Sequence, residues 1–328
     1  MTKLYGHNPE KVIDLLKNRL DKHKKLFNEK PRKLALVVEG GGMRGVLSAG
    51  SLLAVDLLGF RNCFDEIYAT SAGAVNAAYF VSGQGELGIT VYFDYINNSK
   101  FFNPFRLTKI LDVEYVYDYI VPHVKTLNEA AIRKSNTHLY LSVTDVETGR
   151  NRLIDTKTWP DPVSKILKAS SALPILYNRT VELDGRKYID GGASDVLPVR
   201  QAIDRGCTDI LILLTKDKEH ISDPPSQIEK LIYYLSMTRK YPHLMDSYES
   251  LHGLNNENRK LAIGEKTIDG VNIATICPAK SELIVSKITM NRAKLIEGAY
   301  TLAAKTFNFF SADMKKLDSV FERYRAKN

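Results

Sequence analysis

The sequence predicts an α/β fold built on a mainly parallel central sheet. Short, unbroken apolar runs at 34–38 and 210–214 are typical of strands that are covered on both faces. Stretches with helical patterning alternate with these runs along the chain, and this alternation favours parallel strands joined by helices. Of the 328 residues, 44% are apolar and 26% are charged, which is ordinary globular composition and excludes disordered, collagen-like and coiled-coil chains.

The boundaries of the elements follow from their end residues. Asn8 and Pro9 suit the N-cap and the first position of a helix, and Pro31 is expected to end that segment. A strand follows at 34–38, and Gly59 closes a helix that runs from 46 to 58. Further strands are predicted at 67–70, 139–146, 151–155, 210–214 and 271–276. Further helices are predicted at 72–81, 226–262 and 288–326.

Charge and cysteine usage limit the setting in which the chain works. Residues 1–33 hold ten Lys/Arg against four Asp/Glu, and such a basic end favours anionic partners such as lipid headgroups or nucleic acid, although a solvated helix face is the simpler interpretation. The three cysteines, Cys63, Cys207 and Cys277, are too few and too widely spaced for a disulfide framework or a zinc site. No signal peptide and no membrane span is evident. We therefore expect a cytoplasmic protein with, at most, peripheral contact with an anionic membrane.

A glycine-rich loop comes directly after the first strand. Its residues are Glu39, Gly40, Gly41, Gly42, Met43, Arg44 and Gly45. Consecutive glycines expose backbone N–H groups, and the helix that follows adds its positive end, so the loop predicts a cradle for an anion. A phosphate and the oxyanion of an acyl-transfer reaction both suit such a cradle. Arg44 is a candidate to meet a substrate phosphate or carboxylate, with a structural ion pair as the equal alternative.

The same glycines fit the pattern of a dinucleotide site, and this alternative has to be weighed. Such a site needs an acidic residue at the carboxyl end of the next strand. Asp65 and Glu66 precede the strand at 67–70 and therefore lie at its amino end. The residue at its carboxyl end is Ser71, which is not acidic. A P-loop also fails, because no Gly-Lys-Ser/Thr follows the glycines.

Ser71 lies between a short strand and a small-residue helix, which is the setting of a nucleophile elbow. The elbow consists of Ala69, Thr70, Ser71, Ala72 and Gly73. Its small residues let the strand and helix approach closely, so that the hydroxyl lies near helical N–H groups. The alternative is an ordinary N-cap serine.

Asp190 follows a third apolar strand end and precedes Gly191 and Gly192. Asp-Gly is most often a turn. In an α/β sheet, however, strand ends line the crevice where ligands bind, so this carboxylate is a candidate site residue.

Together, the glycine loop, the serine elbow and the Asp-Gly-Gly motif resemble the patatin-like phospholipase family over roughly 34–215. Matches at 141–145, 169–174 and 197–199 extend the resemblance. Glu39 stands where the family usually has Asp, and Ala69 where it usually has Gly. The resemblance implies a patatin-like three-layer fold and three regions: a basic N-terminal helix (1–33), a catalytic domain (34–215) and a mainly helical C-terminal region (216–328).

The resemblance also implies a mechanism and a substrate class. Ser71 would be the nucleophile and Asp190 its general base, in a dyad without histidine. The backbone N–H groups of the glycine loop would hold the oxyanion, with Gly41 and Gly42 as the main donors and Met43 and Arg44 as further candidates. We expect an acyl hydrolase of phospholipids or lysophospholipids that uses no cofactor, needs no metal and binds no nucleic acid.

Two alternatives stay open. A Ser-His-Asp triad could formally use one of three histidines, His220, His243 or His252. The chain could also be a lipid- or nucleotide-binding regulator on a hydrolase-like fold. A final hypothesis concerns the segment after the elbow helix, whose aromatic residues would shape an acyl pocket or lid. These residues are Phe101, Phe102, Phe105, Tyr115, Tyr117 and Tyr119.

Overall fold

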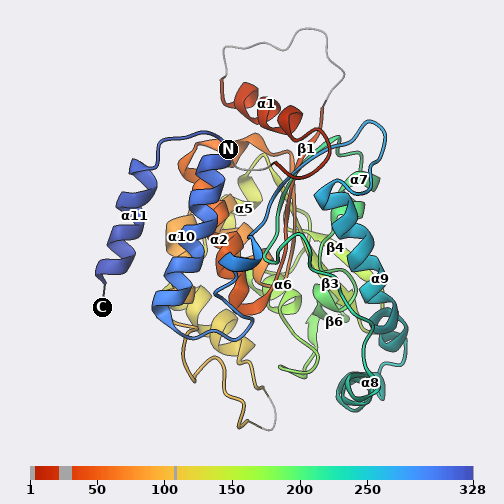
Figure 1. The fold of residues 1–328 in the computed structure, drawn as a ribbon. Helices are drawn as coiled ribbons and strands as arrows, with labels where there is room; N and C mark the ends of the chain where they lie inside the picture. The colour runs from red at the N-terminus through yellow and green to blue at the C-terminus, as the bar shows by residue number, and fades with distance from the viewer. Residues whose placement is uncertain (1–3, 22–31, 107–108, 328) are drawn as a thin grey trace.

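A mixed sheet with helices on both faces forms the centre of the protein (Figure 1). The computed structural model describes residues 4–21, 32–106 and 109–327. The strands within these ranges follow the order β5-β6-β3-β2-β1-β7-β8, and β4 pairs with β3. The five strands from β3 to β8 in this order run parallel, whereas β4, β5 and β6 pair antiparallel. Their bounds are β1 Leu34–Val38, β2 Glu66–Thr70, β3 His138–Asp145, β4 Asn151–Asp155, β5 Val181–Leu183, β6 Arg186–Asp190, β7 Asp209–Leu213 and β8 Asn272–Ile276.

The helices lie in two layers. On one side of the sheet lie α2, α4, α10 and α11, and on the other lie α7 and α9 (Figure 1). The helix bounds are α1 Pro9–Leu20, α2 Gly45–Leu57, α3 Ala72–Val81, α4 Gly85–Asp94, α5 Glu129–Lys134, α6 Val163–Ser170, α7 Val199–Asp204, α8 Gln227–Tyr233, α9 His243–Ile263, α10 Arg292–Phe309 and α11 Lys315–Ala326. Short helical segments at η1 Gly42–Arg44, η3 Tyr115–Val124 and η5 Tyr234–Thr238 connect them. The predicted α/β class with a mainly parallel sheet is confirmed.

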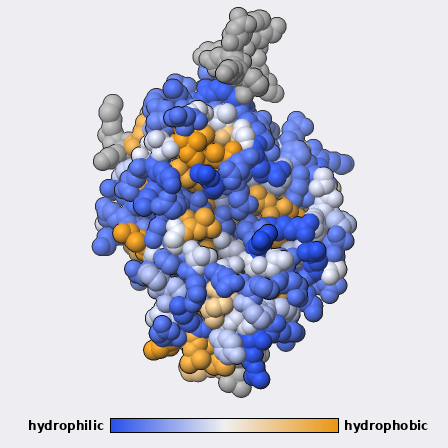
Figure 2. All heavy atoms as spheres, turned by 90° about the vertical axis from the view of Figure 1, so that its right-hand side faces the viewer, coloured by the Kyte–Doolittle hydropathy of each residue, from blue (hydrophilic) through white to orange (hydrophobic). Residues whose placement is uncertain are grey.

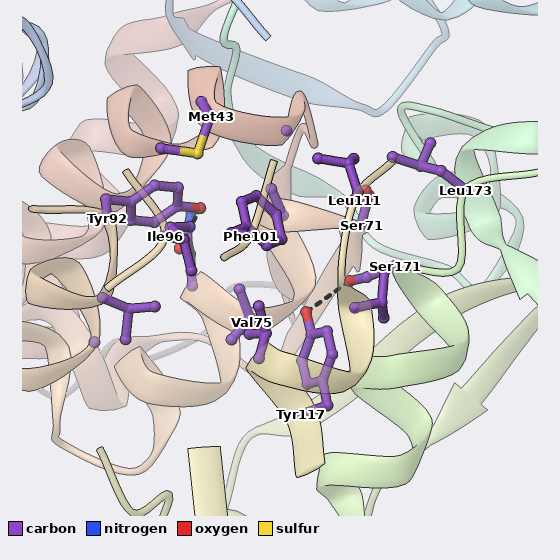
Figure 3. A pocket seen from close by; sticks show the side chains of 17 residues that line it. Met43, Ser71, Val75, Tyr92, Ile96, Phe101, Leu111, Tyr117, Ser171 and Leu173 are labelled. Carbon is purple, nitrogen blue, oxygen red and sulfur yellow. Dashed lines mark hydrogen bonds between the residues drawn. The ribbon is translucent and has the colours of Figure 1, made fainter. Parts of the chain in front are cut away.

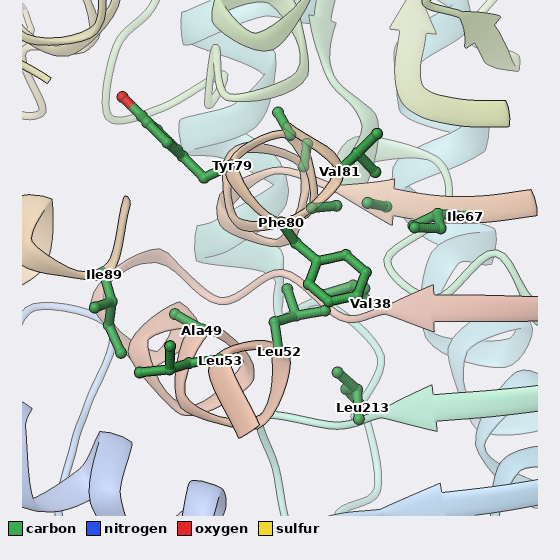
Figure 4. Close-up of a cluster of buried hydrophobic side chains, with 14 of the residues drawn as sticks. Val38, Ala49, Leu52, Leu53, Ile67, Tyr79, Phe80, Val81, Ile89 and Leu213 are labelled. Atoms are coloured by element: carbon green, nitrogen blue, oxygen red, sulfur yellow. The ribbon is translucent and has the colours of Figure 1, made fainter. Parts of the chain in front are cut away.

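The alternation of side chains along β1 explains the two layers. Leu34, Leu36 and Val38 join the core under α2 and α3, whereas Ala35 and Val37 join a second core under α7 and α9. All five side chains are fully buried, as expected for a central parallel strand. Figure 4 shows the first core, where Leu52 of α2 meets Phe80 of α3 beside Val38.

Two predicted helices are interrupted. The stretch 226–262 divides into α8, η5 and α9, with Pro242 directly before α9. The stretch 288–326 divides into α10 and α11, and it begins later than predicted because Asn291 accepts the N–H of Lys294 and caps α10. The predicted end of the first helix at Pro31 lies outside the described residues. No helix in the described ranges is both long and apolar enough to cross a bilayer.

The C-terminal region completes the sheet rather than standing apart from it. β8 pairs with β7 in parallel, and α10 packs along α2. At the amino ends of the strands, α1 contacts β7 and β8. Arg19 of α1 pairs with Asp65, which directly precedes β2. Helix α1 therefore lies at the amino ends of the strands, and the glycine loop lies at their carboxyl ends (Figure 1).

Candidate active site

Ser71 occupies a strained turn between β2 and α3. Its φ of 55° and ψ of −126° cost a non-glycine residue about 1–3 kcal/mol, and such strain persists only where the surroundings fix it. The Ser71 N–H donates to Ser170 Oγ over 3.1 Å, and Ser170 Oγ donates in turn to the carbonyl oxygen of Ser142 over 2.7 Å. Ser170, the last residue of α6, thus fixes the turn at Ser71 through these two hydrogen bonds. The turn directs the Ser71 side chain toward the end of β6.

Asp190 ends β6 and is the hydrogen-bond partner of that serine. Ser71 Oγ donates to Asp190 Oδ2 over 2.7 Å, and the Gly192 N–H donates to Asp190 Oδ1 over 2.6 Å. The aspartate is 1% exposed. Burial raises its pKa to about 6, although the hydrogen bonds from Ser71 and Gly192 and the charge of Lys287 oppose that rise. A carboxylate with this pKa is charged at neutral pH and is a better base than an ordinary aspartate.

The glycine loop has fewer free donors than the sequence suggests. The Met43 N–H donates to the carbonyl oxygen of Lys287 (3.1 Å), and the Arg44 N–H donates to that of Gly41 (3.2 Å). The Gly45 N–H is also used, within the turn. In the described part of the chain, no acceptor meets the N–H of Gly41 or of Gly42. The N–H groups of Met43, Arg44 and Gly45 are thus engaged within the protein, whereas those of Gly40, Gly41 and Gly42 have no acceptor among the described residues.

An apolar cavity begins at Ser71 and extends between α3, α4 and η3 (Figure 3). Val75, Ile96 and Phe101 line it together with Met43 of the glycine loop. Tyr117 also lines it and bonds with Ser171 Oγ over 2.7 Å. Of the predicted aromatic residues, Phe101 and Tyr117 line this cavity. Phe105 and Tyr119 are 93% and 54% exposed, and they do not.

A second cavity opens from the same serine and has a different character. Its lining includes Ser71, Asp190 and the cationic side chains of Arg44, Lys216 and Lys287. Burial lowers the pKa of Lys216 to about 8 and also lowers that of Lys287. Ser71 therefore lies where an apolar cavity meets a cationic one.

The C-terminal region supplies contacts that sequence reasoning missed. Buried Arg259 of α9 pairs with Glu39 over 3.3 Å, and Glu39 also accepts the N–H of Thr215. Lys287 touches the glycine loop through its carbonyl oxygen. No local motif marks Arg259 or Lys287, because each is brought to the loop by the fold. Ser170 lies in a run that the family resemblance highlights, but its role depends on geometry.

The three histidines considered for a triad lie elsewhere. No histidine lines either cavity that contains Ser71. His220 bonds with Lys216, and His252 bonds with the carbonyl oxygen of Glu249. The partner of Ser71 is Asp190 instead. Among the described residues, no group of three or more His, Cys, Asp or Glu side chains could hold a metal ion.

Comparison with known proteins points to one family. Residues 36–203, about half of the chain, match the family model described as patatin-like phospholipase. The uncharacterized protein YjjU of Escherichia coli (strain K12) is 32% identical over 192 residues, which are 56% of this chain and 52% of that protein. The human patatin-like phospholipase domain-containing protein 4 is 34% identical over 74 residues, which are 22% of this chain and 29% of that protein.

The chain thus spans about half or less of the length of these curated relatives. Among solved structures, VipD from Legionella pneumophila is similar with a TM-score of 0.46 and 15% identity, covering 85% of this chain and 67% of that one. The family match includes the glycine loop, the serine elbow and the Asp-Gly-Gly motif. This chain belongs to the patatin-like phospholipase family.

Proposed function

We propose that this protein is a serine acyl hydrolase that cleaves carboxylic esters of phospholipids or lysophospholipids. The observation that carries the proposal is the 2.7 Å hydrogen bond from Ser71 Oγ, in a strained turn, to the buried carboxylate of Asp190. A nucleophile that bonds directly to a base with a raised pKa is the arrangement that nucleophilic catalysis requires. Membership of the family supports a lipid ester as the substrate.

The proposed reaction proceeds through an acyl-enzyme. Ser71 Oγ attacks the ester carbonyl carbon while its proton passes to Asp190 Oδ2. The N–H groups of Gly41 and Gly42 stabilise the oxyanion, and each such donor contributes about 10²–10³ to the rate. Asp190 then returns the proton to the departing alcohol as the ester C–O bond breaks. Water releases the fatty acid in the second half-reaction, again with Asp190 as base.

The apolar cavity is the natural place for the acyl chain. It starts at Ser71, and apolar side chains such as Val75, Ile96 and Phe101 line it. An apolar pocket with few polar groups is typical of sites that take a hydrophobic ligand. In this proposal, Phe101 and Tyr117 shape the acyl pocket, whereas Phe105 and Tyr119 do not.

We place the peripheral membrane contact at the carboxyl ends of the strands, on the side where the cavities at Ser71 lie. Apolar side chains of α8 and η5 face solvent there: Ile228, Leu231, Ile232 and Leu235 are 72%, 57%, 45% and 64% exposed. Tyr233 lies in the same stretch and packs in a cluster with Ile189, directly before Asp190. The charge of Asp190 contributes to raising the pKa of Tyr233. Figure 2 shows apolar side chains at the lower end of this face, the height at which Figure 1 places α8. Helix α1 lies at the other end of the strands, so one flat bilayer would not contact α1 and the site together.

Labelling with a fluorophosphonate tests the proposed chemistry. Wild type, Ser71→Ala and Asp190→Asn are compared by intact mass and by hydrolysis of a fluorescent lysophospholipid. We expect one label on wild type, located at Ser71, and loss of hydrolysis in both variants. A folded wild type that neither takes the label nor hydrolyses the lipid would contradict the proposal.

A further inference from the structure

Three cationic side chains line one cavity beside Ser71, whereas Asp190 alone supplies a carboxylate to the described lining. Arg44 comes from the glycine loop, Lys216 from the segment after β7, and Lys287 from the segment before α10. All three line the cavity that also contains Ser71 and Asp190. They are far apart in the sequence, so the fold itself gathers them at this place.

None of the three makes an ion pair or a hydrogen bond with a carboxylate in the described part of the chain, although the charge of Glu39 acts on all three and that of Asp190 on Lys287. Arg44 Nε and Nη2 are shielded from solvent and make no hydrogen bond. Lys287 is exposed, and its side chain makes no ion pair or hydrogen bond with another described residue. Lys216 Nζ lies 2.7 Å from His220 Nε2. Burial lowers the pKa of His220 to about 4, so that partner is a neutral ring at pH 7.

The nearby carboxylates have other bonds. Glu39 accepts from Thr215 and pairs with Arg259. Asp190 accepts from Ser71 and Gly192, and the Asp217 side chain accepts the N–H of Glu219. The shielded Arg44 nitrogens lose hydration without gaining a hydrogen bond, and the charges of Arg44 and Lys287 oppose the charge of Lys216. A bound anion would offset that cost.

We propose that Arg44, Lys216 and Lys287 form a binding site for the phosphate group of the substrate, so that the enzyme prefers acyl esters that carry a phosphate. The inference rests on the proposed acyl hydrolase function and names the residues that select a phosphate-bearing substrate. A guanidinium and two ammonium groups offer several charged donors from different directions, which suits the oxygens of a phosphate. The Arg44 atoms without partners then find acceptors in the ligand.

The arrangement of the two cavities supports this assignment. Both include Gly42, Ser71, Leu111 and Leu173, so they meet at the nucleophile. A glycerophospholipid has its acyl chain on one side of the ester bond and its phosphate on the other. With the ester carbonyl at Ser71, the chain enters the apolar cavity and the phosphate enters the cationic one.

Binding to an inactive enzyme tests the site separately from catalysis. Calorimetric titration of Ser71→Ala, or of Asp190→Asn as a second inactive background, uses three probes. These are 1-oleoyl lysophosphatidate, 1-oleoylglycerol with the same chain and ester, and inorganic phosphate. We expect lysophosphatidate to bind at least about tenfold more tightly than oleoylglycerol.

The lysine variants then assign that preference to the cluster. Lys216→Met and Lys287→Met should each weaken lysophosphatidate binding about 10–100-fold, and should affect oleoylglycerol far less. Lys315→Met is the matched control, because Lys315 is 92% exposed and lies outside the site. Thermal unfolding of each variant verifies that it is folded.

Each outcome decides one question. Tighter binding of lysophosphatidate than of inorganic phosphate, with dependence on both lysines, supports a lipid headgroup as the ligand. Equal binding of the two with the same lysine dependence supports a site for free phosphate. The phosphate site would be overturned if inactive enzyme bound lysophosphatidate and oleoylglycerol with equal affinity. It would also be overturned if the lysine variants lost affinity for both ligands to the same extent. Failure of the hydrolase proposal would show separately, as a wild type that does not label at Ser71.

Discussion

The backbone N–H of Met43 donates to the carbonyl oxygen of Lys287, which lies 3.1 Å away in the segment before α10. Gly42 is part of the same contact. It adopts a φ of +58°, and a Cβ on it would lie 2.9 Å from that carbonyl oxygen. The loop that supplies the proposed oxyanion donors is therefore held in place by residues more than 200 positions away.

Replacing Gly42 with alanine should separate this contact from simple backbone strain. In Gly42→Ala we expect the rate of lysophospholipid hydrolysis to fall about 10²-fold or more, because the new methyl group displaces Lys287 and misaligns the two donors. Gly185→Ala is the matched control: its φ is +72°, and no atom lies within 4 Å of a Cβ there. That variant should lose about 1 kcal/mol of stability and keep its activity. Equal activity in both variants would contradict the role of the Lys287 contact.

Asp190→Asn should lose activity and gain stability. General-base catalysis contributes about 10²–10⁴ to the rate, so we expect a loss of that size. The folded pKa of Asp190 is raised from 3.8 to about 6, so its ionisation destabilises the wild-type fold. The difference corresponds to roughly 3 kcal/mol.

The stability gain should depend on pH in a defined way. Below about pH 4 the aspartate is protonated in both the folded and unfolded states, and the variant gains nothing from this source. The gain should grow between about pH 4 and pH 6 and stay constant above. Urea unfolding of both proteins at pH 4 and pH 8 measures it, and a variant that is less stable at pH 8 would refute the assignment.

The pH dependence of wild-type hydrolysis should follow the same carboxyl group. With a neutral ester, kcat/KM should fall tenfold per pH unit below about 6, because the base form of Asp190 is lost. The charge of Lys287 lowers that pKa, so Lys287→Met should move the acidic limb to higher pH. Lys315→Met should not move it. A wild-type limb near pH 4 would show that the pKa of Asp190 is not raised.

Filling the apolar cavity should change the acyl chain that the enzyme accepts. Ile96 lines this cavity and lies away from Ser71 in Figure 3. In Ile96→Phe we expect kcat/KM for 16- and 18-carbon esters to fall about tenfold relative to four-carbon esters, because overfilled cores resist added volume. Tyr119→Trp adds a ring at a 54% exposed position outside this cavity and should leave the chain-length profile unchanged. An unchanged profile in Ile96→Phe would place the acyl chain elsewhere.

Vesicle binding should depend on η5 more than on α1. Leu235→Glu puts a charge on an apolar side chain that is 64% exposed beside the site, and should reduce sedimentation with anionic vesicles severalfold. Lys17→Glu changes an exposed charge on α1 and should reduce it less. The opposite ranking would return the membrane contact to the basic helix.

The sequence predicts the central part of this fold well because its signals are local. The apolar run at Leu34–Val38 and the glycines after it define the strand and loop without help from distant residues. The same holds for Ser71 between a strand and a small-residue helix. The family resemblance pairs Ser71 with Asp190, and the structure places the two side chains 2.7 Å apart.

Other features depend on contacts that no local pattern encodes. The sequence makes Met43 and Arg44 candidate oxyanion donors. Their N–H groups, however, donate to the carbonyl oxygens of Lys287 and Gly41. The Glu39–Arg259 pair joins residues 220 positions apart. The aromatic residues at 101–119 also differ in ways that no local pattern predicts. Tyr117 is buried and Phe105 is exposed because of how α4 and η3 pack.

The pairing of β8 with β7 also bears on when the protein gains its activity during synthesis. A ribosome makes the glycine loop, the serine elbow and Asp190 long before it reaches Asn272. Until then β7 is an open edge strand, and Glu39 has no Arg259 beside it. A nascent chain would therefore carry all the proposed catalytic residues without an assembled site, and the proposed hydrolase activity would appear only after the last strand had joined the sheet.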